Sequence, residues 1–130
     1  MAMAILVVDD EEAIRGFVQR ILELHGFTVL AAADGLDAIE KVESFAKPID
    51  LLVTDIRMPR MDGVSLGRWV AKAYPEVPIL YISGYPFDLE GEKPNLPVKV
   101  CAFLPKPFTP KALIETVRQC LPSTKAAVVT

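Results

Sequence analysis

Five side chains that suit metal and phosphate chemistry occur at or just after the ends of short apolar segments. Three are carboxylates, one is a hydroxyl and one is an ammonium group: Asp9, Asp10, Asp55, Ser83 and Lys106. If the carboxylates converge, each pair repels by roughly 4 kcal/mol at about 4 Å and an effective dielectric of about 20. A cation must then offset the repulsion, and oxygen ligands without His or Cys favour Mg²⁺. The residue types therefore indicate a magnesium site.

The same side chains fit phosphoryl transfer. A carboxylate can act as a nucleophile and form an aspartyl-phosphate. Bound Mg²⁺ commonly bridges a carboxylate to a phosphoryl oxygen and neutralises charge there. Lys106 offers a compact positive charge for a phosphoryl oxygen, and the Ser83 hydroxyl offers one adaptable hydrogen bond. Together these groups would form a clamp for a phosphoryl group.

The elements that would carry these side chains alternate between strands and helices. Runs of apolar residues predict five strands, at 4–8, 27–31, 51–54, 79–82 and 102–104. Apolar residues at helical spacing follow all but the fourth strand, and Thr109 with Pro110 would begin the last helix. Between the fourth and fifth strands, residues 84–97 contain three prolines, which predict a short or distorted helix.

This alternation predicts an α/β fold, a doubly wound, flavodoxin-like sheet of five parallel strands with helices on both faces. We expect the strand order 2-1-3-4-5, one of two common orders for such sheets. In that order the carboxyl ends of strands one, three, four and five are neighbours, and ligands bind beyond such ends. The second strand, which carries no functional group at its end, would lie at the edge.

Four of the five candidate residues also have an ordinary structural explanation. Asp9 and Asp10 could place negative charge at a helix N-terminus, Ser83 could belong to a turn, and Lys106 could be a surface lysine. The functional interpretation depends on coincidence, because chemically compatible side chains occur at four adjacent strand ends.

Length and composition indicate one domain without a basic surface. The 130 residues are 52% hydrophobic and carry a net charge of −3, so we expect one domain at 1–122, a flexible tail at 123–130 and no direct nucleic-acid binding. The longest apolar stretch, at 1–8, is far shorter than the roughly 20 residues that span a bilayer. We therefore expect a cytoplasmic protein without membrane contact.

Cys101 and Cys120 have neither metal-ligand spacing nor the density of a disulfide scaffold, which predicts free thiols.

Four motifs resemble those of the receiver domains of response regulators and together extend over nearly the whole chain. They are Val7-Val8-Asp9-Asp10, Thr54-Asp55-Ile56-Arg57-Met58-Pro59-Arg60-Met61-Asp62-Gly63, Ser83-Gly84 and Leu104-Pro105-Lys106-Pro107-Phe108. The resemblance implies that Asp55 is the phosphoacceptor and that Ser83 and Lys106 assist it. It also implies that Asp9, Asp10, Asp55 and the backbone carbonyl of Arg57 hold Mg²⁺.

The resemblance further implies a conformational switch and a docking site. The phosphoryl group would attract the Ser83 hydroxyl, and an aromatic side chain on the fifth strand, here Phe103, would turn inward; the alternative for Phe103 is ordinary core packing. The Lys106-Pro107 peptide bond would be cis. Ile14 would contact a histidine kinase or histidine phosphotransfer protein, or else simply pack in the core.

The resulting functional prediction is a phosphoacceptor signalling switch of a two-component phosphorelay. The domain would assist both its own phosphorylation and its own dephosphorylation, which would be slow. It would act through an unknown downstream effector and would be a monomer or weak dimer. One alternative is the C-terminal receiver domain of a hybrid sensor histidine kinase, and another is a degenerate receiver that binds partners without phosphorylation. An aspartyl-phosphate hydrolase is disfavoured, because haloacid-dehalogenase-type enzymes need an aspartate where this chain has Arg57.

Overall fold

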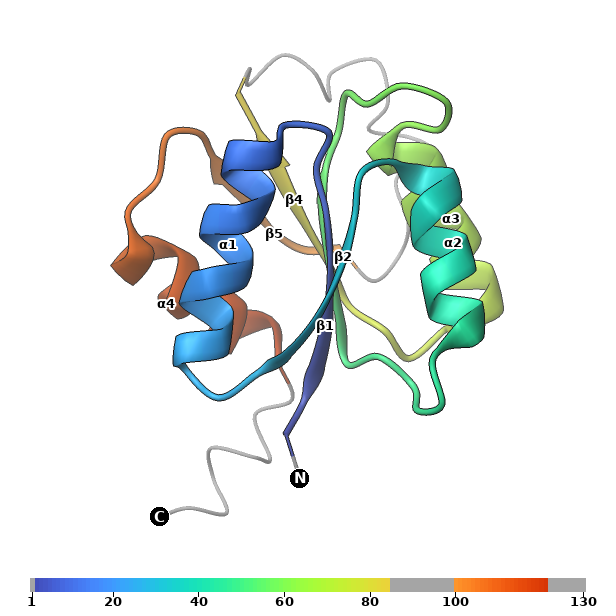
Figure 1. The fold of residues 1–130 in the computed structure, drawn as a ribbon, viewed down its shortest axis with the longest axis horizontal. Coiled ribbons are helices and arrows are strands. Elements are labelled where there is room, and N and C mark those ends of the chain that lie inside the picture. The colour runs from blue at the N-terminus through green and yellow to red at the C-terminus, as the bar shows by residue number, and fades with distance from the viewer. Residues whose placement is uncertain (1, 85–99, 122–130) are drawn as a thin grey trace.

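A parallel sheet forms the centre of the computed structural model, which describes residues 2–84 and 100–121 (Figure 1). Its strands are β1 Ala4–Val8, β2 Thr28–Ala32, β3 Leu51–Asp55, β4 Ile79–Ser83 and β5 Val100–Pro105. All are parallel and lie in the order β2-β1-β3-β4-β5. The predicted fold class and strand order are confirmed.

The described residues form four helices: α1 Glu12–Leu24, α2 Gly35–Ser44, α3 Gly63–Ala73 and α4 Pro110–Cys120. Figure 1 shows α1 and α4 on one face of the sheet and α2 and α3 on the other. Asp34, Asp62 and Thr109 are the N-caps of the last three, and each side chain accepts a hydrogen bond from an amide three residues further on. These caps satisfy amides that have no acceptor within the helix.

Two hydrophobic cores cover the two faces of the sheet. Because successive side chains of a strand point to opposite faces, Ile5 and Val7 join the core beneath α1 and α4, whereas Leu6 and Val8 join the core beneath α2 and α3. Burying each such side chain contributes about 1.5–3 kcal/mol. Packing on both faces fixes the strands, and it therefore fixes the positions of the residues at their carboxyl ends.

The prediction of free cysteine thiols is wrong. Cys101 on β5 and Cys120 at the end of α4 form a disulfide, and their Cα atoms lie 5.3 Å apart across a sequence separation of 19. That Cα distance lies in the range that disulfides require. The pairing arises because α4 packs back along β5, a contact that cysteine number and spacing do not reveal.

Two sequence-based expectations fall outside the described residues. These are the distorted helix at 84–97, of which only Gly84 is described, and the tail at 123–130. Within 2–84 and 100–121, no helix has both the length and the apolar character that crossing a membrane requires.

Candidate functional site at the carboxyl ends of the strands

The carboxyl ends of four strands bring the expected polar side chains to one rim of the sheet. β1 ends directly before Asp9, β3 ends at Asp55, β4 ends at Ser83 and β5 ends directly before Lys106. The Lys106 amide donates a hydrogen bond to the Ser83 carbonyl at 2.8 Å. The ends of the adjacent strands β4 and β5 are thereby joined, and the lysine side chain starts beside the serine.

Lys106 lies at the centre of a cluster of carboxylates. Its Nζ is 3.1 Å from Asp55 Oδ2, 3.2 Å from Asp9 Oδ2 and 3.1 Å from Glu11 Oε1. The lysine side chain is only 14% exposed. When all of these groups are ionised, three negative charges face one positive charge. The cluster then has a net charge of −2, which equals in magnitude the charge of one divalent cation.

The pKa values of this cluster reflect the competition between burial and pairing. Burial raises the pKa of Asp9 and of Asp55, although hydrogen bonds and the Lys106 charge oppose the change. Burial alone would lower the pKa of Lys106, but its hydrogen bond to Glu11 and the charges of Asp9 and Asp55 outweigh burial and raise that pKa. The ammonium is therefore held in its charged form, while the two aspartates are ionised at a cost.

Asp55 is held with one oxygen fixed by the backbone and the other directed at the lysine. Oδ1 accepts a hydrogen bond from the Ile56 amide at 2.7 Å, and Oδ2 accepts one from Lys106. The start of α3 passes close by, because a Cβ added to Gly63 would lie 1.9 Å from the Asp55 carbonyl oxygen. Only glycine fits at that position without moving the backbone of the aspartate.

Asp9 has a buried oxygen that suits a metal. Its Oδ1 accepts a hydrogen bond from the Glu11 amide at 2.8 Å. Its Oδ2 lies within ion-pair distance of Lys106 but accepts no hydrogen bond from any residue that the structure describes. Oxygens from Asp9, Glu11 and Asp55 all lie within 4.8 Å of one another. A buried carboxylate oxygen without a hydrogen bond, in an all-oxygen cluster of net negative charge, fits a hard divalent cation such as Mg²⁺.

The four expected metal ligands differ in burial and in whether their oxygens converge. Asp9 and Asp55 are buried and adjacent, whereas Asp10 is exposed and lies outside the group of converging oxygens. The Asp10 charge nevertheless contributes to the raised pKa of Asp55. Arg57 is exposed on the loop that follows Asp55.

Glu11 is the residue of the site that sequence reasoning missed. It contacts Lys106 although its side chain is 61% exposed. The available signal was the acidic run at 9–12, but a run of charges does not show which side chain turns back toward the strand ends. That direction is set by the start of α1.

The residues predicted for the switch and for partner docking lie on β4, β5 and α1. Phe103 is 46% exposed and stacks on the buried Tyr81, with ring centroids 5.8 Å apart; it is not an ordinary core residue in this structure. Ile14 is partly buried against the core beneath α1 and α4. The Lys106-Pro107 peptide bond is cis, as predicted.

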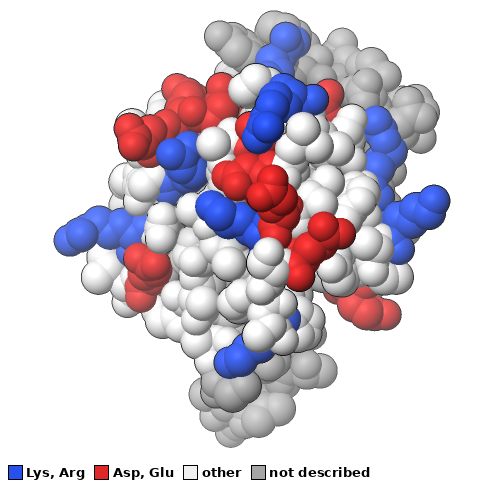
Figure 2. Space-filling model, turned by 45° about the vertical axis from the view of Figure 1, so that its right-hand side comes forward, with Lys and Arg blue, Asp and Glu red and all other residues white. Residues whose placement is uncertain are grey.

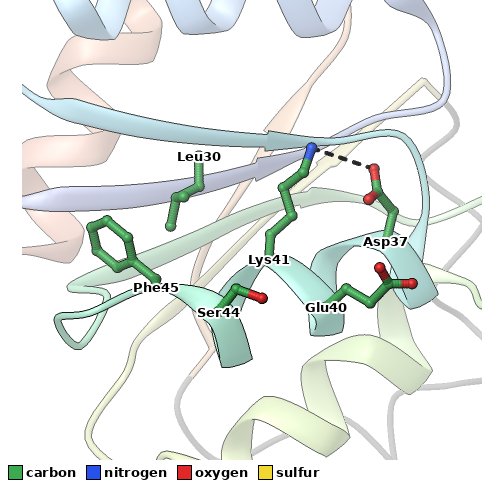
Figure 3. Close-up of a pocket in the computed structure, with 6 residues that line it drawn as sticks. All are labelled: Leu30, Asp37, Glu40, Lys41, Ser44 and Phe45. Atoms are coloured by element: carbon green, nitrogen blue, oxygen red, sulfur yellow. Dashed lines mark ion pairs between the residues drawn. The ribbon is translucent and has the colours of Figure 1, made fainter.

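A separate groove of 290 Å³ lies between β2 and α2, at the edge of the sheet away from this cluster (Figure 3). Leu30 and Phe45 form its apolar part. Lys41 of α2 donates a hydrogen bond to the Ala31 carbonyl of the edge strand β2 at 2.6 Å. That carbonyl is therefore not available to pair with a strand of another chain. Figure 2 shows acidic side chains gathered on this side of the molecule with Lys and Arg among them.

Comparison with known proteins identifies the family to which this fold and site belong. The model of the response regulator receiver domain matches residues 5–118, and the chain belongs to that family. It is similar to the sensor kinase CckA of Brucella abortus (strain 2308), with 40% identity over 118 residues that make up 90% of this chain and 12% of that protein. It is also similar to the response regulator MprA of Mycobacterium ulcerans (strain Agy99), with 37% identity over 126 residues, or 96% of this chain and 53% of that protein. The chain thus spans about half of one relative's length and far less of the other's.

A solved structure with the same fold holds a metal. It is the response regulator protein TrrA from Thermotoga maritima in complex with Mg²⁺-BeF, which has a TM-score of 0.78 and 27% sequence identity and covers 92% of this chain and 99% of that one.

Proposed function

We propose that this protein is a phosphoacceptor signalling switch, in which Asp55 receives a phosphoryl group from a histidine kinase or a histidine phosphotransfer protein. The observation that carries the proposal is the geometry of Asp55. One oxygen is fixed by the Ile56 amide, and the other faces the Lys106 ammonium at 3.1 Å. This arrangement presents one carboxylate oxygen to an incoming phosphorus atom, with a positive charge beside it.

The reaction exchanges one bond to phosphorus for another. Asp55 Oδ2 forms the new O–P bond, and the N–P bond to the donor's histidine breaks, so that the nitrogen keeps the bonding electron pair. Lys106 pairs with a phosphoryl oxygen instead of with the carboxylates. The burial that raises the Asp55 pKa favours this step, because it makes the free carboxylate less stable than it would be in water.

Four oxygen donors would hold the metal: the carboxylates of Asp9, Asp10 and Asp55, and the carbonyl of Arg57. Asp9 and Asp55 already converge, and Asp10 and Arg57 follow the same two strands. When bound, Mg²⁺ would neutralise charge on the phosphoryl oxygens during transfer. Glu11 lies close enough to compete with the phosphoryl group for Lys106.

The switch would act through Ser83 and Phe103. Phosphorylation adds about −1.5 to −2 charges at the rim, and the Ser83 hydroxyl at the end of β4 would turn toward the new oxygens. Phe103 is on the adjacent strand, half exposed against Tyr81, so an inward turn would change the surface that a downstream effector contacts. The phosphoryl group would thereby shift an equilibrium between two states.

Partner docking would use the start of α1. Ile14 lies one helical turn before Phe17, which is 38% exposed and contacts Phe108 with ring centroids 6.0 Å apart. Phe108 follows the Lys106-Pro107 bond, so this small apolar surface borders the phosphoryl site. A kinase or phosphotransfer helix that rested here would present its histidine to Asp55.

The similarity to a sensor kinase supports a second possibility for the whole protein, in which this receiver belongs to a hybrid sensor histidine kinase. The chemistry at Asp55 is the same in both cases. A hydrolase acting on other substrates lacks support, because Arg57 stands where the general acid would be needed.

Incubation with acetyl phosphate and MgCl₂, followed by intact mass spectrometry, tests the proposal. We expect the mass to increase by one phosphoryl group in the wild type and not in Asp55→Asn, which keeps the shape of the side chain. Lys41→Gln, which changes the groove at α2, should be phosphorylated like the wild type. An equal adduct on Asp55→Asn, or no adduct on the wild type, would contradict the proposal.

A further inference from the structure

The loop that follows Asp55 is tied to a neighbouring turn by a two-point ion pair. Arg60 donates from Nε to Asp34 Oδ2 at 2.7 Å and from Nη2 to Asp34 Oδ1 at 2.9 Å. Asp34 belongs to the turn between β2 and α2, 26 residues earlier in the chain. A guanidinium that contacts both oxygens of a carboxylate fixes orientation as well as distance.

Asp34 is a rigid anchor for this contact. It is only 7% exposed, and its Oδ1 also accepts the hydrogen bond from the Asp37 amide that caps α2. The hydrogen bonds from Arg60 hold the pKa of Asp34 below its ordinary value despite burial. The anchor therefore stays ionised and is fixed by the helix that it begins.

The backbone at Arg60 adopts a conformation that its residue type disfavours. Its φ is +66°, in the left-handed region where non-glycine residues are uncommon. The next residue closes the contact with the same turn, because the Met61 carbonyl accepts a hydrogen bond from the Gly35 amide at 3.3 Å. A Cβ added to Gly35 would lie 2.6 Å from Met61 Cγ. The loop is thus held tightly at positions 60 and 61, against a turn that lies outside the phosphoryl site.

We propose that the Asp34–Arg60 pair positions the Arg57 backbone carbonyl for Mg²⁺. The inference rests on the proposed function, in which that carbonyl is a ligand. The loop has one end fixed at Asp55 by the sheet, and the ion pair fixes it three residues beyond Arg57. Mg²⁺ requires near-ideal octahedral geometry at short distances, so a loop free to move by a fraction of an ångström would bind it less well. Arg60 and Asp34 are positioning residues and do not contact the reacting atoms.

Two substitutions separate positioning from folding. Arg60→Gly removes the guanidinium and also relieves the positive φ, so the metal-free protein should unfold at about the wild-type temperature. Asp34→Asn keeps an oxygen to cap α2 but removes the ionised partner. Each should raise the dissociation constant for Mg²⁺ about tenfold, the lower end of the effect expected for groups that orient metal ligands. The double variant should show no further loss, because both changes remove one interaction.

The measurement is the unfolding temperature as a function of MgCl₂ concentration, since a ligand that binds only the native state raises the free energy of unfolding by RT ln(1 + L/Kd), where L is the free ligand concentration. Lys41→Gln, which removes the exposed Lys41–Asp37 pair of α2, is the matched control and should respond to MgCl₂ like the wild type. Wild-type affinity in both Arg60→Gly and Asp34→Asn would overturn the inference and leave the proposed function intact. A tenfold loss in the control as well would also overturn it. A wild type that shows no response to MgCl₂ would instead overturn the proposed function, and the inference with it.

Discussion

The two ends of the sheet bury different kinds of side chain. The buried polar and charged residues among those described are Asp9, Asp34, Thr54 and Asp55, and all of them lie at or beyond the carboxyl ends of strands. At the amino end, a cavity of 500 Å³ is bordered by residues 48–50 and 73–78, which include three prolines and the buried Ile49 and Val77. Asp50, which borders this cavity, accepts a hydrogen bond from the Ala4 amide of β1 at 2.8 Å.

This difference separates what holds the domain together from what makes it reactive. Apolar burial and satisfied hydrogen bonds at the amino end contribute stability directly. The carboxyl end instead buries ionised groups, which is unfavourable unless they are paired. Substitutions at the amino end should therefore change stability alone, whereas those at the carboxyl end should change phosphorylation together with the response to metal.

The largest effect is expected for Gly63→Ala. The added Cβ would overlap the Asp55 carbonyl oxygen, so the start of α3 or the backbone of Asp55 must move. We expect a loss of more than about 4 kcal/mol in the free energy of unfolding, measured with urea, and a loss of phosphoryl incorporation. The control is Gly16→Ala in α1, where a Cβ would have no neighbour within 4 Å; it should stabilise the protein by about 0.5–1 kcal/mol. Equal stability of the two variants would refute the close approach at Gly63.

A smaller loss in the free energy of unfolding is expected for Lys106→Met in metal-free buffer. The substitution leaves the buried Asp9 and Asp55 carboxylates without their cation, which should cost about 3 kcal/mol. Because the cluster then attracts a divalent cation more strongly, MgCl₂ should restore part of the loss. Lys41→Met removes an exposed ion pair at 3.7 Å and an exposed hydrogen bond to the Ala31 carbonyl, and it should change the free energy of unfolding by less than about 1.5 kcal/mol. If the free energy of unfolding falls by the same small amount in both lysine variants, the carboxylates at the carboxyl end do not repel one another strongly.

Apart from the control variants, the smallest loss of stability is expected at the amino end, for Val77→Ala. Val77 is 5% exposed beside the cavity, and removing its methyl groups should cost about 2 kcal/mol. Phosphoryl incorporation and the response to MgCl₂ should stay at wild-type levels when measured well below the unfolding temperature. A matching fall in phosphorylation would show that the two ends are coupled more closely than their chemistry indicates.

The sheet was predictable because its signals are local and repeated. Each apolar run has a strand's length, Thr109 and Pro110 begin α4 as capping chemistry requires, and parallel order then brings Asp55 and Lys106 together. The approach of Lys106 to Asp9 follows from the same reasoning.

The remaining features depend on contacts between distant parts of the chain. The Cys101–Cys120 disulfide, the turn of Glu11 toward Lys106 and the Arg60–Asp34 pair join residues whose spacing has no periodic signal. The half exposure of Phe103 was not predictable either, although its stacking on Tyr81, its register partner on β4, follows from the strand pairing. Such features require coordinates.

The central claim, that the carboxylates at the carboxyl end repel one another until a divalent cation binds, is tested most directly by the unfolding temperatures of the wild type and Asp55→Asn with and without MgCl₂. Burial raises the Asp55 pKa, so its ionised form destabilises the folded state at neutral pH, and this cost disappears as the pH falls through that raised pKa. Without metal at neutral pH, Asp55→Asn should therefore unfold at a higher temperature than the wild type. Adding MgCl₂ should raise the unfolding temperature of the wild type much more than that of the variant. A less stable Asp55→Asn with an equal response to MgCl₂ would contradict the account.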